Sequence, residues 1–287
     1  MNRVRIGTAG IPISAKPRTS KAAVKKLAEL GLECMEIEFV RGVRMGERSA
    51  QELRAESEQH HIELTEHAPY YINLNSSESD KVAASKERIL QAARVGWAAG
   101  AKSVTFHAAY YHDTDHEQVF ENVKRELWEI RRELDDEGNQ IHLRPETTGS
   151  PTQFGTVEEI VRLAAEIPGV YPCIDFSHLH ARSIGAYNTY DEISRVLEFV
   201  QSELGRSALD QMHMHLSGIE YGPKGEKKHL ILPESDMNYQ AVLQALVDHD
   251  VGGWLICESP NLEEDALLLK REYDQIVQNR KGGIGHG

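Results

Sequence analysis

The chain has 287 residues, of which 40% are hydrophobic and 27% charged, and its formal net charge is −13. Such a composition is typical of a globular protein with a real core, and the acidic excess argues against a general nucleic-acid coat protein, which would be basic. No apolar run approaches the roughly 20 residues that span a bilayer. The apolar segment that follows Met1 is too short for a signal peptide. We therefore expect a cytoplasmic protein with no membrane contact.

Eight short apolar or β-rich runs recur along the chain, with helical patterns between them. The runs cover Val4 to Thr8, Cys34 to Phe39, Glu63 to His67, Ser103 to His107, Ile141 to Glu146, Tyr171 to Asp175, Gln211 to Leu216 and Gly253 to Glu258. Parallel strands need crossover connections, so this alternation predicts a parallel sheet of the α/β class. The number eight favours closure into a (β/α)8 TIM barrel. We predict one domain over residues 1–280 and a disordered tail at 281–287.

The predicted helices are recognised by apolar residues that recur every three or four positions. The first, Ser20 to Leu30, begins at a capping serine and stops at Gly31. Three later stripes consist of Phe120, Val123, Leu127, Ile130 and Leu134, then Ile193, Val196, Leu197, Val200 and Leu204, and finally Leu262, Ala266, Leu269, Tyr273 and Ile276. The three cysteines lie far apart in apolar runs, which predicts buried small side chains and no thiolate zinc site.

Six consecutive predicted strands end on, or close to, a histidine or a carboxylate. These residues are His67, His107, Glu146, Asp175, His215 and Glu258. In a closed barrel the C-terminal ends of the strands surround one mouth. Buried histidines and carboxylates need partners there, because isolated burial of a charge is costly. Any one of the six could be an ordinary hydrogen-bonded residue, but together they predict a metal site of mixed imidazole and carboxylate ligands, which suits zinc, or manganese or iron.

Three further histidines lie close to these strand ends. His178 follows Asp175 by three residues, and His229 lies in the long loop after the seventh strand. Both are candidates to hold a further metal, although His229 is equally well explained as a solvated loop residue. His213 shares a strand face with His215 but lies one layer deeper, so we expect it to be hydrogen-bonded inside the barrel or to contact a metal ligand.

Motifs from Gly7 to about Gln278 resemble those of the endonuclease IV family, the metal-dependent apurinic/apyrimidinic endonucleases. The motifs are His67-Ala68-Pro69-Tyr70-Tyr71-Ile72-Asn73-Leu74, Phe106-His107, Pro145-Glu146-Thr147-Thr148-Gly149, Cys173-Ile174-Asp175-Phe176-Ser177-His178, Met214-His215-Leu216-Ser217 and Glu258-Ser259-Pro260. The resemblance implies a trinuclear zinc site. In it His67 and His107 would hold one metal, which Glu146 bridges to a second. The second would be completed by Asp175, His215 and Glu258, and His178 and His229 would bind a third.

The same resemblance implies base excision repair: double-stranded DNA would be cleaved 5′ to an abasic site by zinc-bound hydroxide. Glu146, which would fix the metal separation, and Glu258, which would orient the nucleophile, would be the catalytic residues. Tyr70 matches a family tyrosine that helps to occupy the bent DNA. Candidate phosphate contacts lie in loops after the strands: Arg41 with Arg44 and Arg48, Arg182, and Lys227 with Lys224 and Lys228. We expect a monomer.

The chain departs from the family pattern around the third metal. The family usually has an aspartate two residues before the loop histidine, where this chain has Lys227. Glu226, one residue further back, is the candidate replacement, so the third site is either rebuilt or weaker. The residues after the seventh strand also differ, because Ser217 and Gly218 stand where Asn-Asp is usual.

A rival hypothesis is a sugar isomerase or epimerase of the related barrel superfamily, which uses a single divalent metal. Glu146, Asp175, His215 and Glu258 would serve that scheme equally well. The histidines at 67, 107 and 178 favour the nuclease, because a one-metal isomerase does not require them. A non-enzymatic barrel that kept its ligands for stability is the third and weakest alternative.

Overall fold

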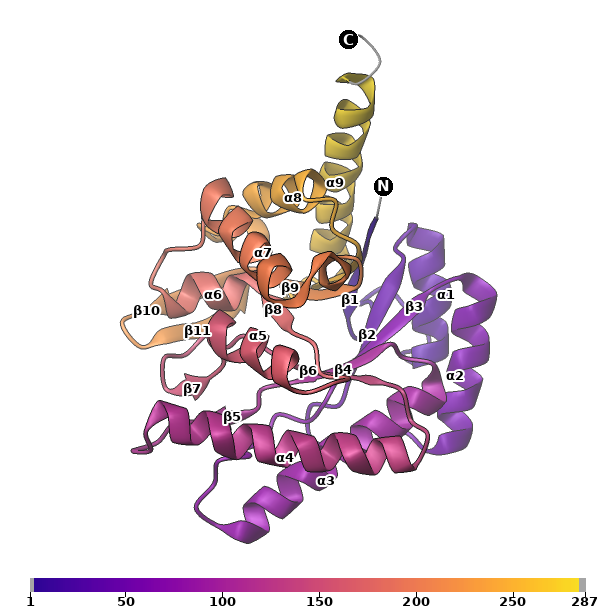
Figure 1. Cartoon of the computed structure of the whole chain (residues 1–287). Coiled ribbons are helices and arrows are strands. Elements are labelled where there is room, and N and C mark those ends of the chain that lie inside the picture. Colours follow the sequence, from indigo (N-terminus) through magenta and orange to yellow (C-terminus); the bar gives the residue numbers. More distant parts are fainter. Residues whose placement is uncertain (1–2, 284–287) are drawn as a thin grey trace.

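A computed structural model describes residues 3–283 of the chain. Eight parallel strands form one sheet in the order β6-β4-β3-β2-β1-β12-β9-β8 (Figure 1). Their bounds are β1 (Val4–Ala9), β2 (Cys34–Glu38), β3 (Glu63–His67), β4 (Ser103–Phe106), β6 (His142–Pro145), β8 (Cys173–Asp175), β9 (Met212–Leu216) and β12 (Gly253–Cys257). The eight predicted runs and the TIM-barrel class are therefore confirmed.

The barrel closes between β6 and β8 through two isolated parallel bridges. One joins Leu143 to Val170 and the other joins Glu146 to Cys173. Pro172, which lies between the two bridged residues of the second segment, has no backbone N–H to donate to a ladder. In the part of the chain that the structure describes, only these two bridges pair the two segments, but they bring the C-terminal ends of β6 and β8 to the same mouth of the barrel.

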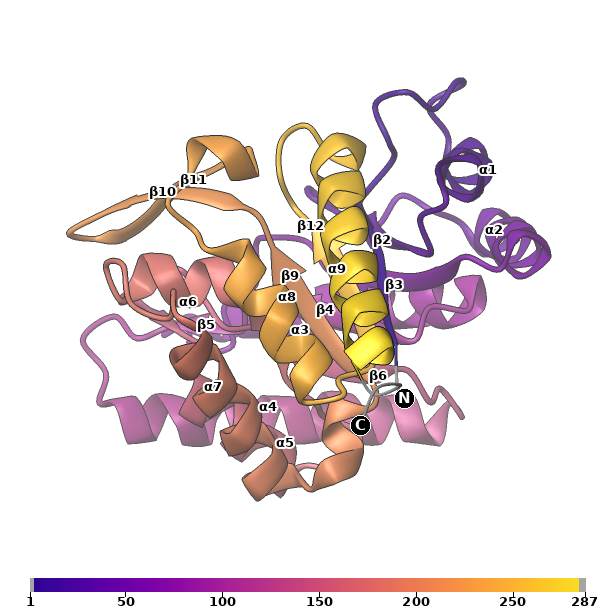
Figure 2. The same cartoon turned by 90° about the horizontal axis from the view of Figure 1, so that it is seen from above.

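Helices surround the strands on the outside of the barrel (Figures 1 and 2). Their bounds are α1 (Ser20–Leu30), α2 (Glu47–His60), α3 (Ser79–Ala99), α4 (His116–Asp136), α5 (Val157–Glu166), α6 (Phe176–Arg182), α7 (Tyr190–Leu204), α8 (Tyr239–Asp248) and α9 (Glu263–Gly283), with short 3-10 turns η1 (Arg206–Leu209) and η2 (Leu232–Glu234). The cap of α1 is Thr19, whose side chain accepts from the Ala22 N–H, so the capping residue lies one position before the serine that we predicted.

The predicted apolar stripes lie against the barrel. In α4 all five stripe residues are at most 2% exposed. In α7 the stripe is buried except at Leu204, which is only partly covered. The stripe of α9 begins one residue before the helix, at Leu262. These faces bury the apolar surface that drives folding.

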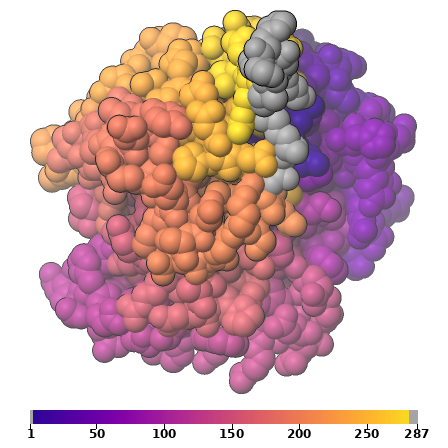
Figure 3. Space-filling view, turned by 45° about the horizontal axis from the view of Figure 1, so that its top comes forward, coloured from indigo at the N-terminus to yellow at the C-terminus, as the bar shows by residue number. Residues whose placement is uncertain are grey.

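The first strand and the last helix lie side by side, which ties the two ends of the described chain into one body. The backbone N–H of Val4 donates to the Tyr273 hydroxyl over 3.0 Å. The space-filling view shows the indigo and yellow segments on the same face of the molecule (Figure 3). Helix α9 continues to Gly283, and residues 284–287, where most of the expected tail falls, lie outside the described residues. Within residues 3–283 no helix combines the length and hydrophobicity needed to cross a membrane.

Two antiparallel ribbons are added to the barrel at its mouth. One pairs β5 (Ala109–Tyr110) with β7 (Gln153–Phe154), and the other is the hairpin of β10 (Gly218–Gly222) and β11 (Gly225–Leu230). The hairpin extends outward beside α6 (Figure 2). His229, which we expected in an irregular loop, lies in β11, so that expectation is wrong: the long connection after β9 folds back on itself as a ribbon.

Candidate metal centre

The ends of β3, β4 and β6 bring together a first group of possible ligands. The Nε2 atoms of His67 and His107 lie 3.3 and 3.5 Å from Oε2 of Glu146. One nitrogen or oxygen from each of the three residues falls within 4.8 Å of the others. Glu146 is 1% exposed, and His107 is the most open member with a side chain that is 21% exposed.

A second group surrounds His215 at the end of β9. Its Nδ1 atom lies 3.2 Å from Oε1 of Glu146, 3.5 Å from Oε1 of Glu258 and 4.0 Å from Oδ2 of Asp175. These four residues again place one ligand atom each within 4.8 Å of one another. Glu146 belongs to both groups because its two oxygens face opposite ways, one toward each set of imidazoles.

A third group consists of His178, His229 and Glu258. Glu226 reaches the same place: its Oε2 lies 3.4 Å from Nε2 of His178, and its Oε1 lies 3.4 Å from Nε2 of His229. The structure thus brings together all eight predicted ligands, and it places Glu226, the candidate replacement, beside His178 and His229.

A β-bulge explains why Glu226 faces this group and Lys227 does not. In the hairpin, Glu220 is opposite Lys228 and Tyr221 is opposite Glu226, so Lys227 is an extra residue without a partner in the ladder. Such a residue resets the alternation of side chains along a strand. Lys227 and Lys228 consequently both point to the Glu220 carboxylate, at 3.2 and 3.4 Å, on the face away from the histidines.

The approach of Glu226 also depends on a glycine in the loop after β6. The backbone N–H of Glu226 donates to the Gly149 carbonyl over 2.9 Å. A Cβ atom at position 149 would overlap the Glu226 carboxylate and Cβ. Only glycine therefore lets the hairpin lie close enough for Glu226 to reach His178.

Three of the histidines are oriented in the same way. Nδ1 of His67 contacts the Ala68 carbonyl at 2.7 Å, Nδ1 of His178 contacts the Thr147 carbonyl at 2.9 Å, and Nδ1 of His229 contacts the Glu258 carbonyl at 3.1 Å. A carbonyl can only accept, so in each ring Nδ1 carries the hydrogen. The Nε2 atoms are then left with their lone pairs pointing into the cluster, which is the arrangement of metal-binding histidines.

The donor set fits divalent metal ions. Among the described residues, Oδ2 of Asp175 and Oε2 of Glu146 are buried oxygens without a hydrogen-bond partner. Buried polar atoms normally have a partner, and a cation supplies one where no hydrogen is available. Imidazole nitrogens mixed with carboxylate oxygens suit zinc, and also manganese or iron.

The carboxylates also hold protons on the histidines. Burial opposes a charge on His67, but the nearby carboxylates of Glu146 and Glu38 raise its pKa to about 10. Burial likewise opposes a charge on His229, but Glu226 raises its pKa to about 9. Burial favours a neutral Glu226, yet the charge of His178 holds its pKa at about 2. A metal ion must displace these protons to bind.

Two predicted substrate contacts lie open at the mouth. Tyr70 is 50% exposed, and its ring lies 5.3 Å from that of His67. Arg41 lines a groove of about 610 Å³ together with Arg18 and Arg44, and Glu38 at the end of β2 lies on its wall. Arg41 and Arg44 are exposed, and neither has an ion-pair partner among the described residues. Both guanidinium groups are therefore free to meet an anion.

Two other predicted contacts are engaged within the protein. Arg182, at the end of α6, donates from Nη1 to the Thr148 hydroxyl over 3.0 Å, to the Gln153 carbonyl over 2.9 Å, and to the Ser150 carbonyl. Its guanidinium thus holds the loop after β6. Lys227 is paired with Glu220 on the outer face of the hairpin.

Sequence reasoning overlooked two carboxylates on β2. Glu36 is fully buried beside His213 and His215, and Glu38 lies two residues further on, within reach of Glu258. Burial raises the pKa of Glu38 to about 8, against the charge of His67. Two glutamates that alternate with apolar residues in a predicted strand were the available signal, because alternate residues face the barrel interior.

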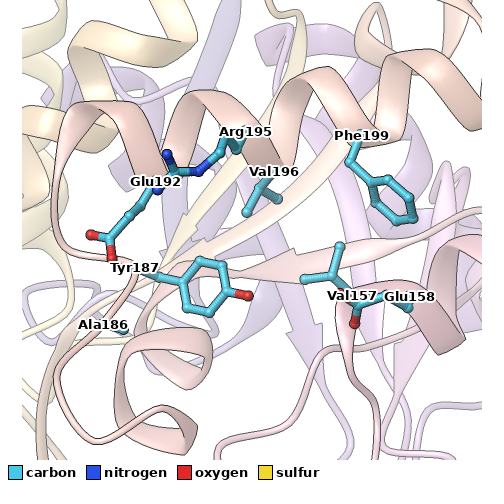
Figure 4. Close-up of a pocket in the computed structure, with 8 residues that line it drawn as sticks. All are labelled: Val157, Glu158, Ala186, Tyr187, Glu192, Arg195, Val196 and Phe199. Atoms are coloured by element: carbon cyan, nitrogen blue, oxygen red, sulfur yellow. The ribbon is translucent and has the colours of Figure 1, made fainter.

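A second cavity, of about 390 Å³, lies on the outside of the barrel. Figure 4 shows Val157 of α5, Tyr187 of the loop before α7, and Phe199 of α7 around it. It is lined by α5, α7 and that loop, whereas the metal-type residues lie at the mouth. We therefore assign the chemistry to the mouth.

Comparison with known proteins agrees with this architecture. A family model described as "Xylose isomerase-like TIM barrel" matches residues 24–276, so the chain belongs to the xylose isomerase-like TIM barrel family. A protein of Methanocaldococcus jannaschii, named as uncharacterized, is 46% identical over 270 residues, which cover 94% of this chain and 97% of that protein.

Solved structures with the same fold include members with different activities. A D-tagatose 3-epimerase-like protein is 20% identical with a TM-score of 0.73, over 95% of this chain and 99% of that one. Endonuclease IV from Thermus thermophilus is 17% identical with a TM-score of 0.71, over 96% of this chain and 99% of that one. At these identities the likeness establishes the shared fold, and the choice of activity depends on the site.

Proposed function

We propose that this chain is a metal-dependent phosphodiesterase that cleaves double-stranded DNA on the 5′ side of abasic sites. The observation that carries the proposal is the set of three ligand groups joined through Glu146 and Glu258. A one-metal centre would leave His67, His107, His178 and His229 without a purpose, whereas a multinuclear centre uses all four. The T. thermophilus endonuclease IV supports the proposal as a neighbour in fold.

The first two groups would hold two ions, and the third group, rebuilt around Glu226, would hold another. When bound, such a cluster supplies a nucleophile from water at neutral pH and neutralises the charge that develops on the phosphate. Zinc is the ion that best suits these ligands, with manganese or iron as substitutes.

Three residues of the chain would have separate roles in positioning the ions, the nucleophile and the substrate. Glu146 would fix the separation of two ions, because its oxygens face His67 and His107 on one side and His215 on the other. Glu258 belongs to the second and third groups and is 12% exposed, so it would orient the nucleophile at the edge of the cluster. Tyr70, exposed beside His67, would pack against the substrate next to the scissile bond.

DNA would be held mainly from the side of β2. Arg41, which we predicted as a phosphate contact, and its neighbour Arg44 offer unpaired guanidinium groups in an acidic protein. Contacts to phosphate position a duplex without reading its sequence. Arg182 would hold the loop that carries Gly149 through its hydrogen bonds. Lys227 would contact DNA only if its ion pair with Glu220 broke.

A sugar epimerase with one metal is the second candidate. The observation that favours it is that Glu146, Asp175, His215 and Glu258 already form a four-ligand group on their own. The D-tagatose 3-epimerase-like protein is a neighbour in fold with a TM-score of 0.73.

Metal counting combined with two activity assays separates these candidates. The protein is stripped with a chelator, reloaded with zinc or manganese and analysed for metal per chain. It is then offered a duplex with one abasic site, or a ketohexose. The proposal predicts two or three ions and incision 5′ to the lesion. One ion with epimerisation of the sugar would establish the rival.

A further inference from the structure

A chain of buried polar side chains crosses the barrel beneath the metal cluster. It runs from Ser103 of β4 through His213 of β9 and Glu36 of β2 to His215, and every member is 0% exposed. We propose that Glu36, itself held by His213, is a positioning residue that fixes His215 in the form that can bind a metal. This inference rests on the metal centre proposed above, but it is independent of the substrate.

The distances give each member of the chain a defined partner. The carboxylate of Glu36 lies 2.8 Å from Nε2 of His213 and 3.0 Å from Nε2 of His215. The Thr65 hydroxyl donates to the same carboxylate over 2.9 Å, and the Ser103 hydroxyl lies 3.0 Å from Nδ1 of His213. A carboxylate can only accept, so both imidazoles present Nε2–H to Glu36.

This assignment decides which nitrogen of His215 is available. Nδ1 of His215 faces Glu258 and Asp175 and makes a 3.2 Å hydrogen bond with Glu146, so in the metal-free protein it shares a proton with that carboxylate. When a metal displaces that proton, the hydrogen held on Nε2 by Glu36 leaves the lone pair of the ring on Nδ1. His213 is satisfied in the same tautomer, because its Nδ1 accepts from the Ser103 hydroxyl. His213 thus has a partner at both nitrogens, and His215, with Glu36 at Nε2, turns Nδ1 toward the cluster.

His215 differs in this respect from the other histidines of the cluster. His67, His178 and His229 are each oriented by a backbone carbonyl, whereas His215 is oriented by a charged side chain. A carboxylate behind a metal-binding imidazole fixes its tautomer and makes the ring a more basic ligand. Because β1 and β12 lie between β2 and β9 in the sheet, this contact spans the barrel interior.

A matched control is present on the next strand. Glu66 of β3 is also 0% exposed, but neither of its oxygens has a hydrogen-bond partner among the described residues. It faces outward to Gly96 of α3, because Thr65 and His67 on either side of it face the barrel interior. Glu66→Gln therefore makes the same substitution at the same burial, with its side chain directed away from the metal centre. Burial raises the pKa of the Glu66 carboxyl well above its usual value, so this variant controls for the change of side chain and not for the loss of a charge.

The test measures metal affinity without any substrate. Wild type, Glu36→Gln and Glu66→Gln are stripped with a chelator and titrated with Co2+ against a competing chromophoric chelator, with the visible Co2+ spectrum recorded. The glutamine at position 36 can donate to Nε2 of His215 and so move the ring hydrogen onto Nδ1. We expect an affinity about 10–100-fold weaker for one ion and an altered spectrum, with Glu66→Gln unchanged. Wild-type affinity in Glu36→Gln, or equal weakening in both variants, would overturn the inference.

Two substitutions at position 213 serve if Glu36→Gln does not fold. Gln at this position can still donate to Glu36, whereas Leu cannot. We expect His213→Gln to retain Co2+ affinity within a few-fold and His213→Leu to lose it; equal affinities would refute the role of His213. A wild-type protein that binds metal but leaves an abasic duplex intact would defeat the nuclease proposal alone, because the affinity comparison uses no DNA.

Discussion

Replacing Glu146 with glutamine removes the carboxylate that faces four imidazoles of the cluster. Its oxygens lie 3.3 Å from His67 and 3.5 Å from His107, and 3.2 Å from both His178 and His215. Glutamine keeps the size of the side chain but offers one neutral oxygen, and its amide group would face an imidazole. Two of the three ligand groups lose a charged ligand at once, because both contain Glu146.

Glu146→Gln should reduce the metal affinity more than the substitution of a residue that only contacts a ligand. Changing a partner of a ligand weakens metal binding by about 10–100-fold, so removing a shared ligand should weaken the binding of two ions by at least about 100-fold each, or about 2.8 kcal/mol. Chelator-competition titration measures the affinity, and incision of an abasic duplex should fall at least as far. Near-UV circular dichroism checks the fold, with Glu66→Gln as the control. Two tightly bound ions in Glu146→Gln, or retained incision, would refute the bridging role.

Three further predictions follow from the same geometry. Arg41→Ala should weaken binding to abasic and intact duplexes alike and lower the slope of log affinity against log salt by about one, as measured by fluorescence anisotropy; an unchanged slope would remove Arg41 from the interface. Glu226→Gln should lose one ion and keep the other two in elemental analysis, whereas a full complement would show that Glu226 is no ligand. Metal affinity should rise between pH 6.5 and 9, because His229, with a pKa of about 9, and His67, with a pKa of about 10, must release protons. In the metal-free protein, the stability that these two raised pKa values contribute is complete below pH 6.5 and is lost as the pH rises through 9 and 10. Titration calorimetry measures the metal affinity and scanning calorimetry the stability. If neither the affinity nor the stability changes with pH in this way, the assignment is contradicted.

The fold and the grouping of the strand-end residues could be predicted because both depend on local pattern. Eight apolar runs separated by helical stripes leave few arrangements other than a barrel, and a residue at the end of such a strand must face the mouth. His67, Glu146 and Asp175 are of this kind. Their neighbourhood follows from the topology without knowledge of any side-chain contact.

The parts that escaped prediction depend on contacts between distant segments. Glu226 was predicted as the candidate replacement for Lys227, but the bulge that turns it toward the cluster arises from pairing with β10 and has no signature in the residues of β11 alone. Glu36 meets His215 across the barrel, between strands that are separated in the sheet by two others. The guanidinium of Arg182 donates its hydrogen bonds to a loop that lies about 30 positions earlier in the chain. None of these pairings could be read from spacing or periodicity.

The most direct test of the central claim joins the metal content to the position of cleavage on one sample. Protein reloaded with zinc is analysed for metal per chain and then incubated with a duplex that contains a single abasic site, labelled at its 5′ end. The account predicts two or three ions and a product that ends in a 3′-hydroxyl immediately 5′ to the lesion. A single ion, an intact duplex and conversion of a ketohexose to its 3-epimer would contradict it.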